Sequence, residues 1–156
     1  MNDFKEFSFL VPTLMEFKGW AVFCDCDLLF LKDVKYLFED LNEEKAIYCV
    51  KHDYLPSEKH KMDGQQQTIY PRKNWSSFIV FNCSHQSNKK LTTEIVNKET
   101  GSYLHQFKWL KDEEIGDLDE RWNWLEGWTS KHNQSDPYAI HYTRGGPWFD
   151  EWQDVE

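Results

Sequence analysis

Residues 19–34 read GWAVFCDCDLLFLKDV, an apolar run followed by two closely spaced carboxylates. Residues 20–24 form a short, almost continuously apolar run, which predicts a central strand that is covered on both faces. Gly19 ends the segment before this strand, and two carboxylates, Asp25 and Asp27, follow it at once. Open α/β sheets bind ligands in the loops outside their strand ends, so the same stretch also predicts a ligand site.

Predicted strands and helices alternate on both sides of this stretch, which is typical of an α/β domain. Apolar residues recur at helical spacing over residues 3–17, and Pro12 interrupts them, which predicts one kinked helix or two short ones. Asp33 is the expected N-cap of a helix over residues 34–40. We also expect strands at residues 46–50, 77–82 and 138–142, a helix at residues 88–97 with Asn88 as its N-cap, and short helices after residue 102.

The composition fits a single soluble globular domain and excludes several classes of protein. The chain has 156 residues, 40% hydrophobic and 29% charged, with no apolar run long enough to span a membrane. Asp and Glu number 27 against 18 Lys and Arg. The net charge of −9 argues against a general nucleic-acid or anionic-membrane binder, although a metal ion would offset part of the negative charge locally.

The cysteines predict reduced thiols in a cytoplasmic protein. All four lie in or beside apolar runs and lack the Cys-x-x-Cys spacing of a zinc site. The first residues lack the basic and then apolar pattern of a secretion signal. We therefore expect the cysteines to be small, reduced, apolar side chains in the cytoplasm.

Asp25 and Asp27 are the first candidate site residues. Alternate residues of an extended chain lie on one side, so both carboxylates are expected to face the same way. Two oxygen ligands at this spacing suit Mg²⁺ or Mn²⁺, which would bridge to phosphate oxygens. Asp-x-Asp alone is a weak pattern, and the alternative is that one Asp caps a turn and the other is solvated.

Residues 52–75 are the second candidate region. They are polar and have no clear period over more than twenty positions, which in a compact domain is more typical of a functional loop than of filler. Side chains of this loop could line an acceptor pocket, and a solvated loop explains them equally well. The side chains in question are His52, Asp53, His60 and Lys61.

Residues 19–34 resemble the donor-metal segment of GT-A glycosyltransferases, in particular the retaining family that includes glycogenin and the lipopolysaccharide galactosyltransferases. Three further segments resemble motifs of that family in the same order: NWSSFIVFN at 74–82, LDERWN at 118–123 and HYTRGGPW at 141–148. The resemblance implies one shortened GT-A-like, Rossmann-like α/β domain over residues 1–156. Its central sheet would be mainly parallel and flanked by helices.

The resemblance also implies a donor and metal site. Asp25 would contact the donor ribose and the metal, Asp27 would hold the metal, and His141 would complete a Mn²⁺ (or Mg²⁺) site. Gln106 joins Asp25 as a catalytic candidate, because His105-Gln106 stands about where such enzymes have Asp-Gln under the donor sugar; a surface helix explains that pair equally well. The implied substrate-binding residues are Asp25, Asn74, Ser76, Ser77, Arg144, Gly145, Gly146 and Trp148.

The chain departs from the family's pattern at several positions. Gly146 stands where the family has a Lys that contacts the diphosphate, and Arg144 could supply the missing cation. Strict register puts Trp75 at the family's Asn, with Asn74 one residue early, and Ser77 replaces a Gly. The family has about a hundred nucleotide-binding residues before Asp-x-Asp, where this chain has about 24, so most of that half is expected to be missing.

Three functions are consistent with these residues. The first is a metal-dependent glycosyltransferase of the hexosyltransferase type, which would transfer a sugar from a nucleotide-diphospho-sugar, with UDP-sugar as the expected donor, to a glycan or small-molecule acceptor. The second is a catalytically inactive, truncated binding module. The third is a nucleotide-sugar hydrolase, in which water is the acceptor. We expect no nucleic-acid partner and no membrane span, and exposed sheet edges would invite a homo-oligomer.

Overall fold

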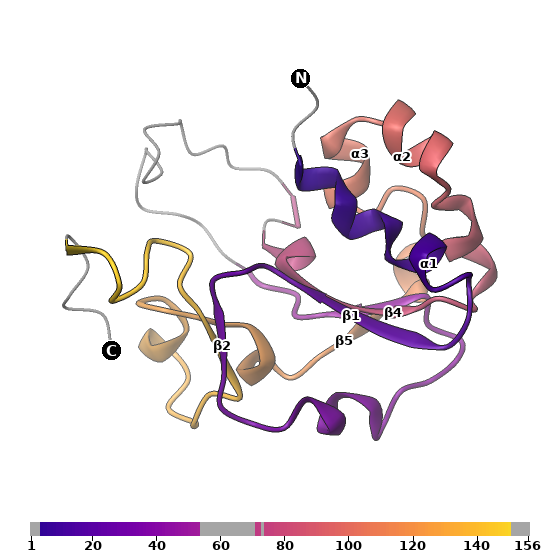
Figure 1. The fold of residues 1–156 in the computed structure, drawn as a ribbon. Coiled ribbons are helices and arrows are strands. Elements are labelled where there is room, and N and C mark those ends of the chain that lie inside the picture. The colour runs from indigo at the N-terminus through magenta and orange to yellow at the C-terminus, as the bar shows by residue number, and fades with distance from the viewer. Residues whose placement is uncertain (1–3, 54–70, 73, 151–156) are drawn as a thin grey trace.

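The computed structural model describes residues 4–53, 71–72 and 74–150, which form two small sheets surrounded by short helices (Figure 1). The larger sheet has the order β1-β4-β3-β5, with bounds Trp20–Cys24, Phe78–Asn82, Ile47–Cys49 and Ile115–Asp117. The smaller sheet has the order β2-β7-β6, with bounds Leu28–Phe30, Ala139–His141 and Trp124–Leu125.

Most of the described helices are short 3₁₀ helices. The α-helices are α1 (Val11–Leu14), α2 (Thr93–Lys98) and α3 (Gly101–His105). The 3₁₀ helices are η1 (Phe4–Leu10), η2 (Val34–Phe38), η3 (Trp75–Ser77), η4 (Gln86–Lys90), η5 (Asp112–Glu114), η6 (Glu120–Asn123) and η7 (Thr129–Lys131). Within the described ranges, no helix combines the length and the apolar character needed to cross a membrane.

The larger sheet is mixed. β4 is antiparallel to both of its neighbours, β1 and β3, whereas β3 and β5 are parallel. The strands β1, β3 and β5 therefore run in one direction and β4 runs between them in the other. The prediction of a mainly parallel sheet is correct for the direction of these three strands but wrong for the pairing of β1 and β3, which are both antiparallel to β4. The apolar run of a buried strand does not indicate in which direction the strand runs.

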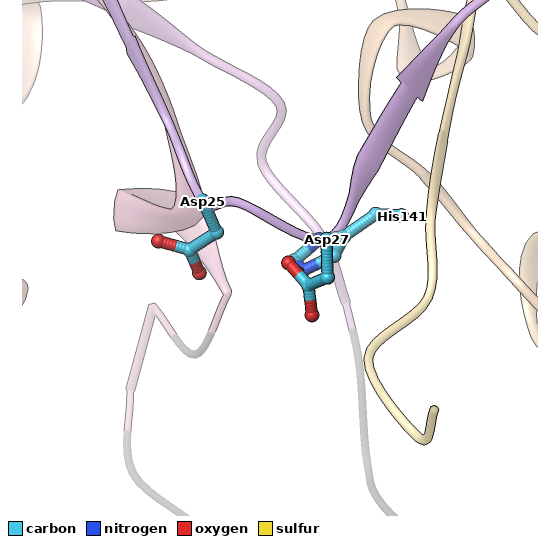
Figure 2. Close-up of side chains that lie close together, drawn as sticks. All are labelled: Asp25, Asp27 and His141. Carbon is cyan, nitrogen blue, oxygen red and sulfur yellow. The ribbon is translucent and has the colours of Figure 1, made fainter. Parts of the chain in front are cut away.

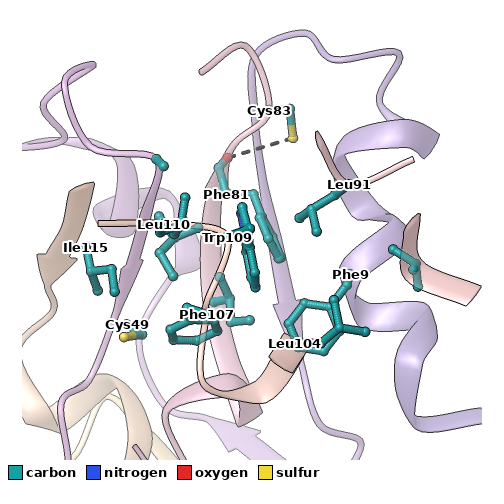
Figure 3. Packing of buried hydrophobic residues seen from close by; sticks show 14 residues of the cluster. Phe9, Cys49, Phe81, Cys83, Leu91, Leu104, Phe107, Trp109, Leu110 and Ile115 are labelled. Carbon is teal, nitrogen blue, oxygen red and sulfur yellow. Dashed lines mark hydrogen bonds between the residues drawn. The ribbon is translucent and has the colours of Figure 1, made fainter. Parts of the chain in front are cut away.

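Different layers cover the two faces of the larger sheet. On one face, η1, α2 and α3 contribute Phe9, Val96 and Leu104 to a cluster that also contains Phe81 and Trp109 (Figures 1 and 3). On the other face, Leu37 of η2 and Trp122 of η6 pack with the side chains of β2. Helices therefore cover one face, and the smaller sheet with two 3₁₀ turns covers the other, where helices on both faces were expected.

Two predicted helix caps have different outcomes. Asp33 caps η2 as expected, with its carboxylate accepting from Lys35 N at 2.9 Å. Asn88 is not an N-cap, since α2 begins later and Thr92 caps it. Asn88 is instead fully buried, and its amide donates to the carbonyls of Ala46 and Asn82 at 2.7 and 2.8 Å. A buried amide that satisfies strand carbonyls has the same sequence appearance as a cap.

β1 is an edge strand, although its sequence is typical of a central one. Asp25 N donates to Ser77 O, and Cys83 N donates to Gly19 O, so the odd-numbered residues of β1 bond to β4. The backbone groups of the even-numbered residues point away from β4, and no other described strand pairs with them. β1 has none of the charges or prolines that usually protect an edge.

We expect amide hydrogen exchange to reveal this edge. Ala21 and Phe23 donate toward β4 and should be protected, whereas the amides of Trp20, Val22 and Cys24 should exchange at least about tenfold faster. NMR or residue-resolved mass spectrometry would measure both sets. Equal protection of the two sets of amides would contradict an open edge at β1. If that protection were lost when the protein is diluted, a second copy of the chain would be the partner that pairs with β1.

Candidate metal centre

The turn Asp25-Cys26-Asp27 connects the two sheets. β1 ends directly before Asp25, and β2 begins directly after Asp27. The backbone N–H of Asp25 donates to Ser77 O at 2.8 Å, which ties this residue to the entrance of β4. The carbonyl of Asp27 accepts from Tyr142 N at 3.0 Å, which ties that residue to the end of β7. Backbone hydrogen bonds from both sheets therefore fix the two ends of the turn.

Asp25, Asp27 and His141 lie together at this turn (Figure 2). Each offers one ligand atom, and these atoms all lie within 4.8 Å of one another. His141 is brought there by the smaller sheet, where it pairs with Leu28, the residue after Asp27. Asp25 is exposed, Asp27 is half-buried and His141 is buried. The three side chains that were predicted as metal ligands thus converge, with the exposed carboxylate at the solvent side.

The donor set fits a divalent cation. Asp27 Oδ1 is buried, makes no hydrogen bond within the described part of the chain, and lies 3.2 Å from His141 Nε2. A buried carboxylate oxygen without a donor is costly unless a cation takes the donor's place. Two carboxylates and one imidazole are ligands of the kind that Mn²⁺ or Mg²⁺ accepts.

Two pKa shifts describe the charge at the turn. Burial alone would raise the pKa of Asp27, but a proton on the adjacent His141 ring, when that ring is charged, outweighs burial and holds the pKa of Asp27 below its ordinary value. Asp27 is therefore ionised at neutral pH, as a metal ligand must be. Burial, followed by the charges of Asp25 and Asp27, raises the pKa of the Cys24 thiol. In the metal-free protein Cys24 therefore stays a neutral thiol at neutral pH.

The turn before β4 holds the predicted substrate-binding residues Asn74, Ser76 and Ser77. Asn74 has φ of 64°, a left-handed conformation that Asn tolerates well, and starts the η3 turn. Ser77 Oγ donates to Asn74 O at 2.6 Å, while the Asn74 side-chain nitrogen is buried and makes no hydrogen bond to any described residue. Since Ser77 also bonds to Asp25, this turn lies directly beside the candidate metal ligands.

The structure separates the His105-Gln106 pair. His105 Nδ1 lies 2.7 Å from Ser76 Oγ, so this histidine contacts the turn before β4. Gln106 follows α3, and its side-chain amide donates to Ser102 Oγ of the same helix at 2.9 Å. Of the two residues, His105 is the one that contacts the candidate site, and the catalytic role of Gln106 stays a prediction.

Arg144 forms an ion pair with Glu126. Two guanidinium nitrogens donate to one carboxylate oxygen of Glu126 at 2.8 and 3.3 Å. Glu126 N in turn donates to His141 O at 3.0 Å, which keeps the pair close to the backbone of the metal ligand. Gly127 has φ of 66°, and a Cβ there would lie 2.7 Å from Arg144. The cation that was predicted to replace the family's Lys is thus present but already paired with a carboxylate.

Gly145 and Gly146 shape the turn after β7. Gly145 has φ of 138°, which favours glycine, and its N–H donates to Tyr142 O at 3.0 Å. A Cβ on Gly146 would lie 2.0 Å from the Trp148 ring, so only glycine allows this contact. Trp148 packs edge-on against Tyr142 and remains 57% exposed. Its indole is therefore largely open to solvent, beside the residue that follows His141.

Two further buried side chains, Asn123 and His52, lie beside the candidate ligands. The sequence predicted no role for Asn123, and it gave His52 only as one of four loop side chains that could line an acceptor pocket. Asn123 is fully buried and its side chain lies 2.9 Å from both His141 Nδ1 and Ser77 Oγ. His52 is buried, its ring nitrogens bond to no described residue, and its carbonyl accepts from Trp75 Nε1 at 3.0 Å. The motif at 118–123 pointed to Asn123, whereas nothing local distinguished His52 from Asp53; His60 and Lys61 lie outside the described residues.

Comparison with solved structures identifies the fold. The bifunctional glycosyltransferase WbbM in its apo form superposes with a TM-score of 0.64 at 17% identity, over 95% of this chain and 32% of that chain. Galactosyltransferase LgtC, in complex with donor and acceptor sugar analogues, gives 0.55 at 11% identity, over 94% and 62%. GlyE from Streptococcus pneumoniae TIGR4 gives 0.53 at 18% identity, over 91% and 38%. The chain has a GT-A-like fold.

This GT-A-like fold confirms the α/β class and the resemblance drawn from residues 19–34 and 141–148. The chain matches no protein-family model. It is 53% identical over 158 residues to Protein CDI from Arabidopsis thaliana, and the match covers 99% of this chain. The chain spans 61% of the length of that relative.

The stability of the protein should depend on pH through His52. Burial is the main cause that lowers the pKa of His52 to about 3, so the folded state keeps this ring neutral where the unfolded state, with a pKa of about 6.5, takes up a proton. The unfolded state then binds more protons, and the free energy of unfolding should fall by about 2 kcal/mol between about pH 7.5 and 5 from this group.

Chemical denaturation of the wild type and of His52→Gln over this range would measure the contribution. The variant should lose about 2 kcal/mol less than the wild type on acidification, whatever its absolute stability. Parallel pH dependence in the two proteins would contradict a neutral, buried His52.

Proposed function

We propose that the chain is a metal-dependent glycosyltransferase that uses a nucleotide-diphospho-sugar. One observation carries this proposal: Asp25, Asp27 and His141 converge, within 4.8 Å, at the turn between the two sheets of a GT-A-like fold. Their oxygen and nitrogen atoms match the ligands of Mn²⁺ or Mg²⁺, and we propose UDP-sugar as the donor. The type of sugar transferred would be a hexose.

The proposed site residues have two roles, holding the metal ion and contacting the donor. Asp27 and His141 are held by backbone bonds of the smaller sheet and would anchor the ion, while the exposed Asp25 would meet the donor. A bound Mn²⁺ or Mg²⁺ supplies Lewis-acid stabilisation of the charge that develops on the leaving diphosphate. Arg144 and the backbone N–H group of Gly146 would donate to the same phosphates, and Gly145, whose N–H bonds to Tyr142 O, would shape the turn that presents them. No protein nucleophile or base is assigned.

Polar groups beside the metal ligands support the binding of a sugar. The Asn74 side-chain amide is buried without a partner in the described chain, which suits a donor to a sugar hydroxyl. His52 lies beside this turn, because Trp75 Nε1 donates to its backbone carbonyl, and it offers a neutral imidazole ring. The exposed indole of Trp148 offers a face on which a pyranose could stack. Ser76, paired with His105, would position the turn that carries Asn74.

The pairing of Arg144 with Glu126 supports a second candidate, because it occupies the cation expected at the diphosphate. We therefore also consider a binding module that retains the metal and sugar pocket without transferring a sugar. A nucleotide-sugar hydrolase would use the same metal residues with water as the acceptor, and product analysis separates it from a transferase.

We extend the proposal to partners and localisation. A second copy pairing along β1 would cover its unpaired backbone groups and form a homo-oligomer. The free thiols of all four cysteines support a reducing compartment, and we propose the cytoplasm.

Titration with UDP, with and without Mn²⁺, tests the metal-dependent donor site. We expect UDP to raise the unfolding free energy only when Mn²⁺ is present, by about 2.7 kcal/mol at a hundredfold excess over Kd. ADP and GDP should give smaller shifts. Asp27→Asn and His141→Ala should each abolish the response because each removes a metal ligand.

Asp117→Asn is the matched control, since it removes a carboxylate that pairs with Lys51 on the larger sheet. Unchanged Mn²⁺-dependent UDP affinity in the two ligand variants would refute the metal assignment. If UDP binds, mass spectrometry of UDP-sugar incubations distinguishes transfer to a glycan from release of free sugar. Binding without turnover of any UDP-sugar would favour the binding module.

A further inference from the structure

Asn123 connects the metal ligands to the turn before β4. Its side chain is completely buried at the end of η6. One side lies 2.9 Å from His141 Nδ1, and the other lies 2.9 Å from Ser77 Oγ and 3.5 Å from Asn74 O. Ser77 O, in turn, accepts from the backbone of Asp25. A continuous set of contacts therefore runs from Asp25 through Ser77 and Asn123 to His141.

The orientation of the Asn123 amide follows from the available protons. Asn74 O is a carbonyl and can only accept. Ser77 Oγ lies 2.6 Å from it and must donate its single proton there. Toward Asn123, the serine oxygen can then only accept, so the atom of Asn123 that faces Ser77 is the NH₂ group.

This orientation decides which nitrogen of His141 carries the proton. With its NH₂ group on Ser77, Asn123 turns its carbonyl oxygen to His141 Nδ1, and that nitrogen must donate. In the neutral ring, Nε2 then carries a lone pair and faces Asp27 Oδ1 at 3.2 Å. Two acceptors that face each other repel, and a cation bound to both removes the repulsion.

We propose that Asn123 is a positioning residue that holds His141 in the Nδ1–H tautomer, which makes Nε2 the metal-binding atom. Through Ser77, Asn123 would also fix the distance between His141 and Asp25. The inference rests on the proposed metal site and deepens it by naming the ligating atom and the residue that selects it. Histidine ligands of metals are generally oriented by a hydrogen bond from their other nitrogen. Here the bond partner is itself oriented by the turn that holds the proposed sugar-binding residues.

Nitrogen NMR of the metal-free protein tests the tautomer directly. With ¹⁵N-labelled histidine at about pH 8, where an imidazole is ordinarily neutral, His141 should show a protonated Nδ1 and a bare Nε2. Asn123→Asp keeps an oxygen acceptor for Nδ1 and should retain this tautomer. Asn123→Ala removes the acceptor and should shift the ring toward the Nε2–H form. A wild-type ring protonated on Nε2, or an unchanged tautomer in Asn123→Ala, would overturn the proposal.

Calorimetric titration with Mn²⁺ provides the second readout. Loss of an orienting residue of this kind should weaken metal binding about 10–100-fold in Asn123→Ala. Asn133→Ala, which removes a surface amide that bonds to Glu120, is the matched control and should bind Mn²⁺ as the wild type does. Equal Mn²⁺ affinity in wild type and Asn123→Ala would contradict the positioning role.

The two proposals fail in different ways. A wild-type protein that binds no Mn²⁺ but shows the Nδ1–H tautomer would refute the metal site and leave the tautomer assignment standing. A wild-type protein that binds Mn²⁺ through Asp27 with His141 in the other tautomer would refute the role of Asn123 and leave the metal site standing. If Asn123→Ala does not fold, Asn123→Asp and the wild-type spectrum still decide the tautomer.

Discussion

The turn between β1 and β2 is the constraint on which the candidate site depends. It crosses from one sheet to the other in only three residues, Asp25 to Asp27, and each end is held by a backbone hydrogen bond. Because Tyr142 N holds the carbonyl of Asp27, the preceding residue His141 lies at the same level. The meeting of carboxylates and imidazole is thus a consequence of how the two sheets join, and it needs no separate binding loop.

This arrangement costs stability locally, and the core on either side offsets the cost. A buried polar atom without a partner costs about 1–3 kcal/mol, and Asp27 Oδ1 and the Asn74 amide are both of this kind within the described chain. Both faces of the larger sheet are packed: Ala21 and Phe23 face one apolar cluster, while Val22 faces the other. Unsatisfied polar groups in a well-packed frame are typical of a site that awaits a ligand.

The sequence predicts the contiguous features well and the long-range contacts poorly. The strand before Asp25 and the pairing of Asp25 with Asp27 depend on neighbouring residues, so periodicity and spacing are sufficient. β2 and β6 have three and two residues, too few to show a period. The contact of Asn123 with His141 joins positions 18 apart, and no local pattern encodes it. The motif at 118–123 marked the segment through a resemblance, but the role of its last residue required the fold.

The open edge of β1 lies directly beside the candidate metal centre. The outward backbone groups of β1 end at Cys24, one residue before Asp25. Any strand that pairs with this edge therefore borders the exposed carboxylate of the cluster. Asp25 is the most exposed of the three candidate ligands, so its surroundings change with whatever covers β1, whereas Asp27 and His141 are fixed by the smaller sheet. The two inner residues of the candidate centre, Asp27 and His141, are therefore positioned by the described chain alone, whereas the surroundings of Asp25 depend on what lies along β1.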